Sequence, residues 1–294
     1  MTENILLIGC NGQLGWECQR TLSPFGQLTC LDYPQINLQE PQTLPGLIRD
    51  IKPSFIVNAA AYTNVDKAES EPEIAKRINA DAPGIMAKTA RSIGAAFFHF
   101  STDYVFDGTK GQDYFESDPP NPLNEYGKSK LLGEQQVLAN NTSAIIFRTS
   151  WVYSSRASSF VRKAIDWSHK QEIVKIVTDQ IGSPTWARLL AEVTAILISR
   201  ASQSRQDWMN EKGGLYHLAG LGSSNRFEVA KLALELDPDK ENQLCKSLQG
   251  ALTSDFPTPA RRPLNTGLNC DLFEKTFNLK LPDWRLALKQ ALEK

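Results

Sequence analysis

The residues with the clearest chemical potential are Tyr126 and Lys130, which lie four positions apart in a segment expected to be helical. Side chains at this spacing share one face of a helix. A phenol with a pKa of about 10 is a poor acid–base group at neutral pH unless a nearby cation favours its ionised form. The pair therefore predicts a tyrosine acid–base group tuned by lysine. The alternative is that both side chains lie on a solvent-exposed helix surface and take no part in chemistry.

A second chemical feature is the glycine-rich run Gly9-Cys10-Asn11-Gly12-Gln13-Leu14-Gly15, which follows an apolar run and opens an amphipathic one. In that context we expect Gly9 to allow a tight turn and Gly12 to let a pyrophosphate approach the backbone. Gly15 would let the helix pack closely. The free N–H groups at the helix N-terminus would then hold the phosphates of a dinucleotide.

Asp32 ends the second apolar run, at about the distance from the glycine loop where an acid meets the adenosine ribose hydroxyls. A carboxylate there favours NADH over NADPH, although a turn aspartate at a strand end is the alternative. The sequence leaves the choice between NADPH and NADH open. Thr102, in Ser101-Thr102-Asp103, follows another apolar run and places a hydroxyl at the edge of the sheet where ligands bind.

The elements that must position these residues alternate between short apolar runs and amphipathic segments. Strands are predicted at 4–8, 28–31, 55–57, 96–100 and 144–147, with helices at 13–22, 43–51, 82–93 and 123–139. The last helix is expected to have Asn121-Pro122 as its N-cap and first-turn proline. This rhythm predicts an α/β fold with a Rossmann-type, doubly wound parallel sheet. A smaller mixed α/β lobe would follow.

The predicted boundaries follow a loosening of this pattern after residue 150. We expect residues 1–150 to form an NAD(P)-binding Rossmann domain, with part of about 185–220 returning to it. Residues 151–184 and 221–294 would form the substrate-binding lobe.

The amino-acid composition limits the classes of molecule that the chain is expected to bind. Hydrophobic residues make up 41% of the chain, charged residues 22%, and the net charge is −1. This excludes disorder and argues against nucleic acid or anionic membranes as partners. Met1-Thr2-Glu3-Asn4 lacks the cations of a secretory signal, and the five cysteines are scattered, so we expect a cytoplasmic protein. The three histidines lack ligand spacing, so no zinc site is predicted and no metal is expected in catalysis.

Longer strings carry a resemblance to a known family. Besides the glycine loop and the Tyr126/Lys130 pair, the strings are Asn58-Ala59-Ala60-Ala61-Tyr62-Thr63, Asn79-Ala80-Asp81-Ala82-Pro83, Ser101-Thr102-Asp103-Tyr104-Val105-Phe106-Asp107-Gly108, Arg148-Thr149-Ser150-Trp151-Val152-Tyr153, Asp179-Gln180-Ile181-Gly182-Ser183-Pro184-Thr185 and Arg262-Pro263-Leu264-Asn265. The chain resembles the extended short-chain dehydrogenase/reductases and, among them, the dTDP-4-dehydrorhamnose reductase family. The resemblance runs from about residue 4 to about residue 290.

The resemblance implies a reaction and roles for the residues. NAD(P)H would reduce the C4 ketone of dTDP-4-dehydro-L-rhamnose to give dTDP-L-rhamnose. Tyr126 would donate the proton, and Lys130 would lower the tyrosine pKa and hold the nicotinamide ribose. Thr102 would hydrogen-bond the carbonyl oxygen. These three residues are the expected catalytic set.

The implied binding residues form two groups. Expected to bind the cofactor are Gly9, Asn11, Gly12, Gln13, Leu14, Gly15, Asp32, Ala59, Ala60, Ala61, Tyr126 and Lys130. Expected to bind the substrate are Val65, Thr102, Asp103, Phe106, Tyr126, Trp151 and Arg262. By family analogy, Val65 and Phe106 would line the sugar pocket. The Trp151 indole suits a sugar or base surface, and the Arg262 guanidinium suits a diphosphate.

Three points stay open at this level. Relatives commonly carry Asn where this chain has Ser159, which implies an intervening water or a different substrate. Some relatives hold Mg²⁺ between subunits, and the only candidate ligands for such an ion in this chain are Glu17 and Glu192. The chain could be a monomer or a homodimer. The alternative functions are another sugar-nucleotide epimerase or dehydratase, or a non-catalytic regulatory subunit. Tyr104 stands where the dehydratases carry their Glu.

Overall fold

The computed structural model describes residues 3–156 and 159–293. Met1 and Thr2, on which the predicted lack of a secretory signal partly rests, lie outside this part. The larger lobe is built on a six-stranded sheet in the order β10-β5-β4-β3-β1-β2, and every neighbouring pair is parallel. Its strands are β1 (Glu3–Ile8), β2 (Gly26–Leu31), β3 (Phe55–Asn58), β4 (Ala96–Thr102), β5 (Ile145–Thr149) and β10 (Gly214–His217). The predicted doubly wound parallel sheet is confirmed.

Both faces of this sheet are covered by helices. On one face lie α1 (Gln13–Leu22), α8 (Ala187–Ala201) and α11 (Asp271–Phe277); on the other lie α2 (Leu44–Ile51), α5 (Ala82–Ile93) and α6 (Glu125–Asn140). In β1, Ile5 and Leu7 join the first core, whereas Leu6 and Ile8 join the second. Strands buried on both faces are continuously apolar, which explains why their sequences do not alternate.

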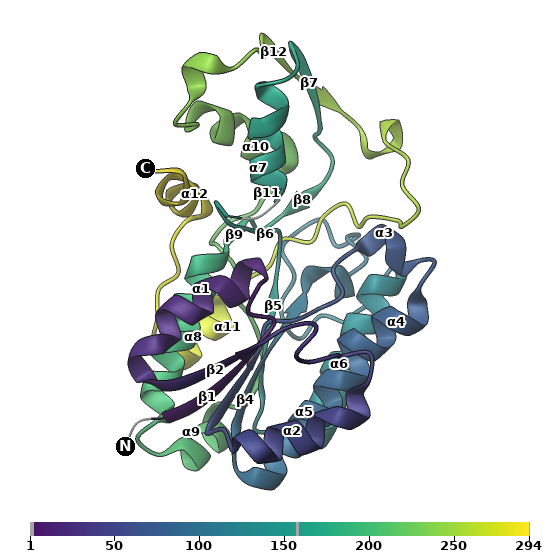
Figure 1. Cartoon of the computed structure of the whole chain (residues 1–294). Helices are drawn as coiled ribbons and strands as arrows, with labels where there is room; N and C mark the ends of the chain where they lie inside the picture. Colours follow the sequence, from purple (N-terminus) through teal and green to yellow (C-terminus); the bar gives the residue numbers. More distant parts are fainter. Residues whose placement is uncertain (1–2, 157–158, 294) are drawn as a thin grey trace.

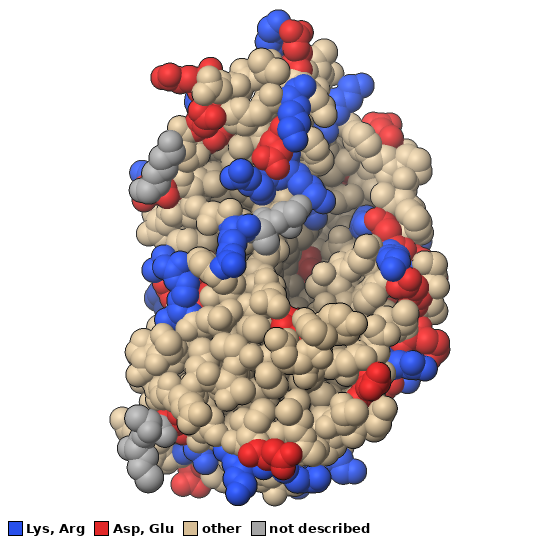
Figure 2. Space-filling view, viewed as in Figure 1, with Lys and Arg blue, Asp and Glu red and all other residues tan. Residues whose placement is uncertain are grey.

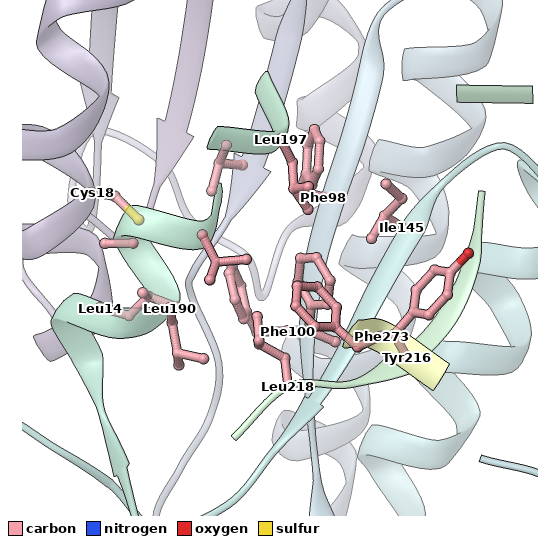
Figure 3. Packing of buried hydrophobic residues seen from close by; sticks show 14 of the residues in the cluster. Leu14, Cys18, Phe98, Phe100, Ile145, Leu190, Leu197, Tyr216, Leu218 and Phe273 are labelled. Carbon is pink, nitrogen blue, oxygen red and sulfur yellow. The ribbon is translucent and has the colours of Figure 1, made fainter. Parts of the chain in front are cut away.

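Figure 3 shows the first of these cores close up. Phe273 of α11 lies 6.0 Å from Phe147 of β5, centroid to centroid, and leucines of α1 and α8 belong to the same cluster. Phe277, at the end of α11, lies 4.9 Å from Tyr216 of β10, centroid to centroid, and both are buried. We therefore place α11 with the larger lobe, although the sequence suggested the substrate lobe for this segment.

The helix that carries Tyr126 begins later than predicted. Asn124, not Asn121, is its N-cap, because the Asn124 side chain accepts a hydrogen bond from the backbone N–H of Gly127 at 2.8 Å. The Asn121 amide instead donates to Asp107 at 3.0 Å. Tyr126 consequently lies in the first turn of α6, at the carboxyl edge of the sheet.

Short elements complete the larger lobe. They are α3 (Val65–Ala68), α4 (Pro72–Lys76) and α9 (Arg205–Lys212). The segment from α8 to β10 returns to the sheet: α8 packs along α1, and β10 pairs with β5. The division into a Rossmann domain and a substrate lobe remains our proposal for the domain organisation.

The smaller lobe stands above the carboxyl edge of the sheet (Figure 1). Its elements are β6 (Val152–Tyr153), α7 (Phe160–Ser168), β7 (Ile173–Val177), β8 (Ile181–Gly182), β9 (Thr185–Trp186), β11 (Ser224–Asn225), α10 (Arg226–Glu235), β12 (Ser247–Ala251) and α12 (Trp284–Leu292). Tyr153, Val161 and Trp284 belong to its own apolar core. Among the residues described, no helix has the length and apolarity to span a membrane.

Candidate active site

A cavity of about 530 Å³ opens where the glycine loop meets the carboxyl ends of the strands. Figure 2 shows a hollow between the two lobes, with Lys and Arg side chains gathered above it. The cavity wall contains eleven of the twelve residues predicted to bind a cofactor: Gly9, Asn11, Gly12, Gln13, Leu14, Asp32, Ala59, Ala60, Ala61, Tyr126 and Lys130. Residues that are far apart in the sequence thus share one site.

Each glycine of the loop has a distinct geometric reason. Gly9 adopts a φ of +84°, and a Cβ there would lie 2.6 Å from the Ala60 nitrogen. A Cβ on Gly15 would lie 2.0 Å from the Gly9 carbonyl oxygen, so Gly15 brings α1 against the turn and not into the cavity wall. At Gly12 the nearest atom would be 3.4 Å away, which leaves this backbone open to a ligand.

Asp32 follows β2 and reaches the glycine loop. Its carboxylate accepts hydrogen bonds from the backbone N–H groups of Asn11 and Tyr33, both at 2.8 Å. The side chain is half-buried and lines the cavity. This position suits a ribose at the outer end of a dinucleotide.

Tyr126 and Thr102 come together from α6 and the end of β4. Burial raises the pKa of Tyr126 above its ordinary value, and the nearby Thr102 hydroxyl offsets this only in part. Gly127 makes this approach possible, because a Cβ there would lie 2.3 Å from the Tyr104 carbonyl oxygen. The phenol therefore carries its proton at neutral pH, as a proton donor must.

Lys130 is 1% exposed, and its Nζ donates to the Phe100 carbonyl oxygen at 2.6 Å. Burial lowers the pKa of Lys130 to about 8, while Glu134 works in the opposite direction. Lys130 is thus close to neutralisation near physiological pH. Its lowering effect on the pKa of Tyr126 stays a prediction, because in this structure burial decides the direction of the Tyr126 pKa.

Asp103, predicted to bind the substrate, is surrounded by hydroxyl groups in this structure. It is 2% exposed and accepts hydrogen bonds from the hydroxyls of Ser150 at 2.8 Å and Thr266 at 2.5 Å, besides Thr102 at 3.1 Å. A buried carboxylate requires such donors. Burial raises the pKa of Asp103 and its hydroxyl partners lower it. Asp103 therefore positions Thr102 and connects the end of β4 to Ser150 and Thr266, while its contact with a substrate stays a prediction.

Phe106, predicted to line the sugar pocket, lies in the core in this structure. Its side chain is fully buried and stacks on Tyr114 with ring centroids 4.1 Å apart. The Arg148 guanidinium also contacts this ring, 5.0 Å from its centroid. The ring thus packs in the core next to the sheet, and its role in a sugar pocket stays a prediction.

Trp151 lies at the start of the smaller lobe with a φ of +45°, in the left-handed region. The Arg226 guanidinium stacks on its ring, 4.0 Å from the centroid. Together with Phe160 and Pro184 they line a pocket of about 170 Å³. This arrangement is a cation–π pair on a half-buried aromatic ring.

Arg226 is a candidate functional residue that the sequence reasoning missed. It opens α10, hydrogen-bonds Tyr104, and donates to Gln180 at 3.2 Å. Arg262 lies close enough to lower the pKa of Arg226, as burial also does. One feature of the sequence could have indicated Arg226. Asn225 is a good N-cap residue, and its side chain caps α10, so it marks the start of a helix whose first residue is Arg226.

Arg262 lines a second cavity of about 420 Å³, which is formed mainly by residues 107–109 and 256–262. One guanidinium nitrogen, Nη2, donates to Asp66 of α3 at 2.7 Å. The other, Nη1, is buried without a partner among the described residues. The arginine is therefore held in place by an acid, and the two N–H bonds of Nη1 are left without a partner among the described residues.

Val65 and Ser159 were also singled out in the sequence, and the structure places both outside the cofactor cavity. Val65 opens α3 and is half-buried, outside the walls of the three cavities described above. Ser159 is the N-cap of α7, where its hydroxyl accepts from the Arg162 backbone N–H at 3.3 Å. The departure at Ser159 thus has a local structural use, since Ser and Asn are both good N-caps.

Gln13 and Thr149 also point to a ligand. The Gln13 Oε1 and the Thr149 Oγ1 are buried in the cavity wall without partners among the described residues. Such atoms are expected to be satisfied by a ligand or water. Thr149 pairs with Thr102 in register across β5 and β4, a signal that the string Arg148-Thr149-Ser150 contained.

A metal site finds no support in the residues described. They contain no group of three or more His, Cys, Asp or Glu side chains suited to an ion. Glu192 pairs with Arg188 at 2.8 Å. Glu17 is buried, which raises its pKa. We assign no Mg²⁺ to the chain.

A doubly wound sheet, a glycine loop at the start of its first helix and a Thr–Tyr–Lys set at its carboxyl edge define a nicotinamide-dependent oxidoreductase of the short-chain dehydrogenase/reductase type. Residues 3–294 match the family described as "RmlD substrate binding domain". The chain belongs to this family.

Individual relatives support this placement. The chain is 41% identical to a dTDP-4-dehydrorhamnose reductase of Escherichia coli, with 98% of this chain and 97% of the relative covered. A dTDP-4-dehydrorhamnose reductase from Clostridium acetobutylicum has a similar structure, with a TM-score of 0.89, 32% identity and 98% of each chain covered. The enzyme of that name from Bacillus anthracis, solved in complex with NADP, gives a TM-score of 0.88, 31% identity and 99% coverage of each chain.

Proposed function

We propose that this chain reduces the C4 ketone of dTDP-4-dehydro-L-rhamnose to give dTDP-L-rhamnose. The curated relatives of this name cover almost the whole chain, so the proposal concerns a complete match and not a shared domain alone. The observation that carries it is the position of Tyr126 and Lys130 in the wall of the cofactor cavity, one helical turn apart on α6, with the Tyr126 phenol protonated.

The cavity fits a nicotinamide dinucleotide. The open backbone at Gly12 and the free N–H groups of the α1 N-terminus suit its phosphates. Gln13 and Thr149 offer buried oxygens that have no partner among the described residues. When bound, NAD(P)H supplies the hydride. Asp32 reaches the same cavity and would hold the adenosine ribose, with the balance between NADH and NADPH to be measured.

The chain's own groups would handle the proton and the developing charge. Tyr126 donates its proton to the oxygen of the ketone as general acid. The Thr102 hydroxyl donates to Asp103 in this structure and would turn its one O–H group to the same oxygen when the ketone is bound. Lys130, with one N–H group on the Phe100 carbonyl, would turn the others toward the nicotinamide ribose.

The nucleotide sugar would occupy the hollow between the lobes. Arg226 and Arg262 lie close to one another and would hold the diphosphate. Trp151, stacked on Arg226, offers its ring to the sugar or the base. These residues give the chain a local site for a small anion despite its net charge of −1. We place the enzyme in the cytoplasm as a monomer or homodimer.

The test is to follow NADPH and NADH absorbance with dTDP-4-dehydro-L-rhamnose as substrate. The proposal expects one cofactor oxidised for each sugar reduced, with the two cofactors compared at equal concentration. Turnover of the sugar without net oxidation would identify an epimerase or dehydratase. Absence of any turnover with tight binding to another enzyme would identify a regulatory subunit.

A further inference from the structure

The buried side of Lys130 faces two polar side chains whose roles remain open. Asn58 ends β3 and His99 lies in β4, and both are fully buried. The Asn58 Nδ2 is 3.1 Å from the His99 Nδ1. On the other edge of the ring, the His99 Nε2 is 3.5 Å from the Lys130 Nζ. The three side chains form a row from one strand to the next and on to α6.

The hydrogen bonds of this row fix the proton on the histidine ring. The Asn58 Oδ1 accepts from the Ala60 backbone N–H at 3.2 Å, which orients the amide. Its Nδ2 must then donate to the His99 Nδ1. Burial and the nearby Lys130 hold the pKa of His99 well below its ordinary value, so the ring is neutral. A neutral imidazole has one N–H group, which is therefore on Nε2.

This tautomer places an N–H group opposite the Lys130 nitrogen. An ammonium group has donors only, whereas a neutral amine offers a lone pair that can accept from His99. The contact therefore favours the neutral amine. The groups that favour the ammonium are the Phe100 carbonyl oxygen and Glu134, whose carboxylate is bonded to Arg148 at 2.7 Å. Tyr126, on the same helix, is protonated and neutral.

We propose that Asn58 and His99 are positioning residues that hold an N–H group against Lys130 and so set the pH at which Lys130 loses its charge. The inference deepens the proposed function, in which Lys130 holds the nicotinamide ribose. The cofactor loses its charged partner as Lys130 is deprotonated. Its affinity therefore falls as the pH rises through the pKa of Lys130, which is about 8.

The test compares cofactor binding across pH in two variants that change the row differently. H99F removes the N–H group and keeps a ring of similar shape. N58D provides a carboxylate that takes the Nδ1 proton as a partner, so that Nε2 turns its lone pair to Lys130. In both variants we expect the alkaline midpoint of NADH and NADPH binding, followed by cofactor fluorescence, to move up by about one pH unit.

The matched control is H217F, because His217 is the other fully buried histidine and its ring is hydrogen-bonded to the backbone carbonyls of Tyr114 and Asn269. Its midpoint should equal that of the unmodified protein. A merely structural role for His99 would weaken binding at every pH and leave the midpoint in place.

Nitrogen NMR of the unmodified protein with labelled histidine tests the tautomer without any substitution. His99 should show a protonated Nε2 and an unprotonated Nδ1 throughout the pH range in which binding is followed. A proton on Nδ1, or an unmoved midpoint in a folded H99F or N58D, would overturn the inference. These experiments need the cofactor alone, so a failure to reduce the sugar would count against the proposed function and not against this row.

Discussion

At the scale of single residues, the chemistry of the candidate site depends on the protonation states of Tyr126 and Lys130. Tyr126 keeps its proton because burial raises its pKa, while Lys130 comes close to losing its own because burial lowers the pKa to about 8. Both shifts have one cause, the unfavourable desolvation of a charged group. The same low-polarity surroundings thus produce a proton donor and a lysine that responds to pH.

Replacing Tyr126 with phenylalanine should remove the proton donor and leave the cavity intact. We expect Y126F to lower kcat by roughly 10²–10⁴-fold, with cofactor affinity changed little. Stopped-flow or steady-state absorbance and a fluorescence titration check the two quantities. Y216F is the matched control, because the Tyr216 hydroxyl donates to the Lys212 carbonyl away from the cavity. Near-normal kcat in Y126F would refute the role.

Asp32 provides a second prediction at this scale. The carboxylate is expected to accept hydrogen bonds from the adenosine ribose and to repel a 2′-phosphate. D32A should therefore reduce NADH affinity more than NADPH affinity, as measured by parallel titrations. Equal or unchanged dissociation constants for both cofactors would contradict the assignment.

The sequence predicted part of this site well, for a physical reason. Tyr126, Lys130 and Thr102 sit in short strings next to regular elements, and all are found where the parallel sheet ends. Phe106 and Asp103 lie in an equally distinctive string, but their burial depends on residues that are distant in the chain or beyond the next loop, namely Tyr114, Ser150 and Thr266. Arg226 was missed because its partners also come from elsewhere.

At the scale of elements, close backbone approaches bring the functional groups together. Gly15 lets α1 contact the turn after β1, and Gly127 lets α6 contact the Tyr104 backbone. The contact at Gly15 could be predicted from the spacing of the glycines in the sequence. The first residue of α6 could not be predicted in this way, because Asn121 and Asn124 are both suitable N-cap residues. Only the hydrogen bond from Asn121 to Asp107 decides between them.

The contact at Gly15 can be tested with a second glycine as control. In G15A the new methyl group would meet the Gly9 carbonyl and the Cys10 backbone, which cannot move without shifting the phosphate loop. We expect a loss of about 1–3 kcal/mol in the free energy of unfolding, together with weaker cofactor binding. Urea unfolding and NADPH titration measure both.

G46A provides the comparison. Gly46 lies inside α2, and a methyl group at this position would have no atom within 4 Å of it outside its own helix turn. Alanine there should raise the free energy of unfolding by about 0.5–1 kcal/mol and leave cofactor affinity unchanged. Equal effects of the two substitutions would remove the special role given to Gly15.

At the scale of the whole molecule, buried neutral histidines make stability depend on pH. His217 is fully buried, and burial with the nearby Arg148 lowers its pKa to about 3. Between that value and the ordinary one of 6.5, the unfolded chain binds a proton at this position that the folded chain does not. The free energy of unfolding therefore falls as the pH falls through this range.

The size of this effect can be isolated with H217F. Unfolding in urea, followed between the two pKa values of His217, should show a pH slope that is smaller in H217F by about 1.4 kcal/mol per pH unit in the middle of the range. The carboxyl groups are common to both proteins, so their contribution cancels in the difference. Parallel pH profiles would show that His217 is protonated equally in the folded and unfolded chains.

The two lobes together define the central claim, which is hydride transfer to C4 of a nucleotide-linked sugar between a cofactor cavity and an arginine-lined hollow. The most direct measurement uses NADPH that carries deuterium at the transferable position, with dTDP-4-dehydro-L-rhamnose as substrate and mass and NMR analysis of the product. We predict dTDP-L-rhamnose with one deuterium at C4 for each cofactor oxidised. Product without deuterium at C4, or a sugar that changes while the cofactor stays reduced, would contradict this claim.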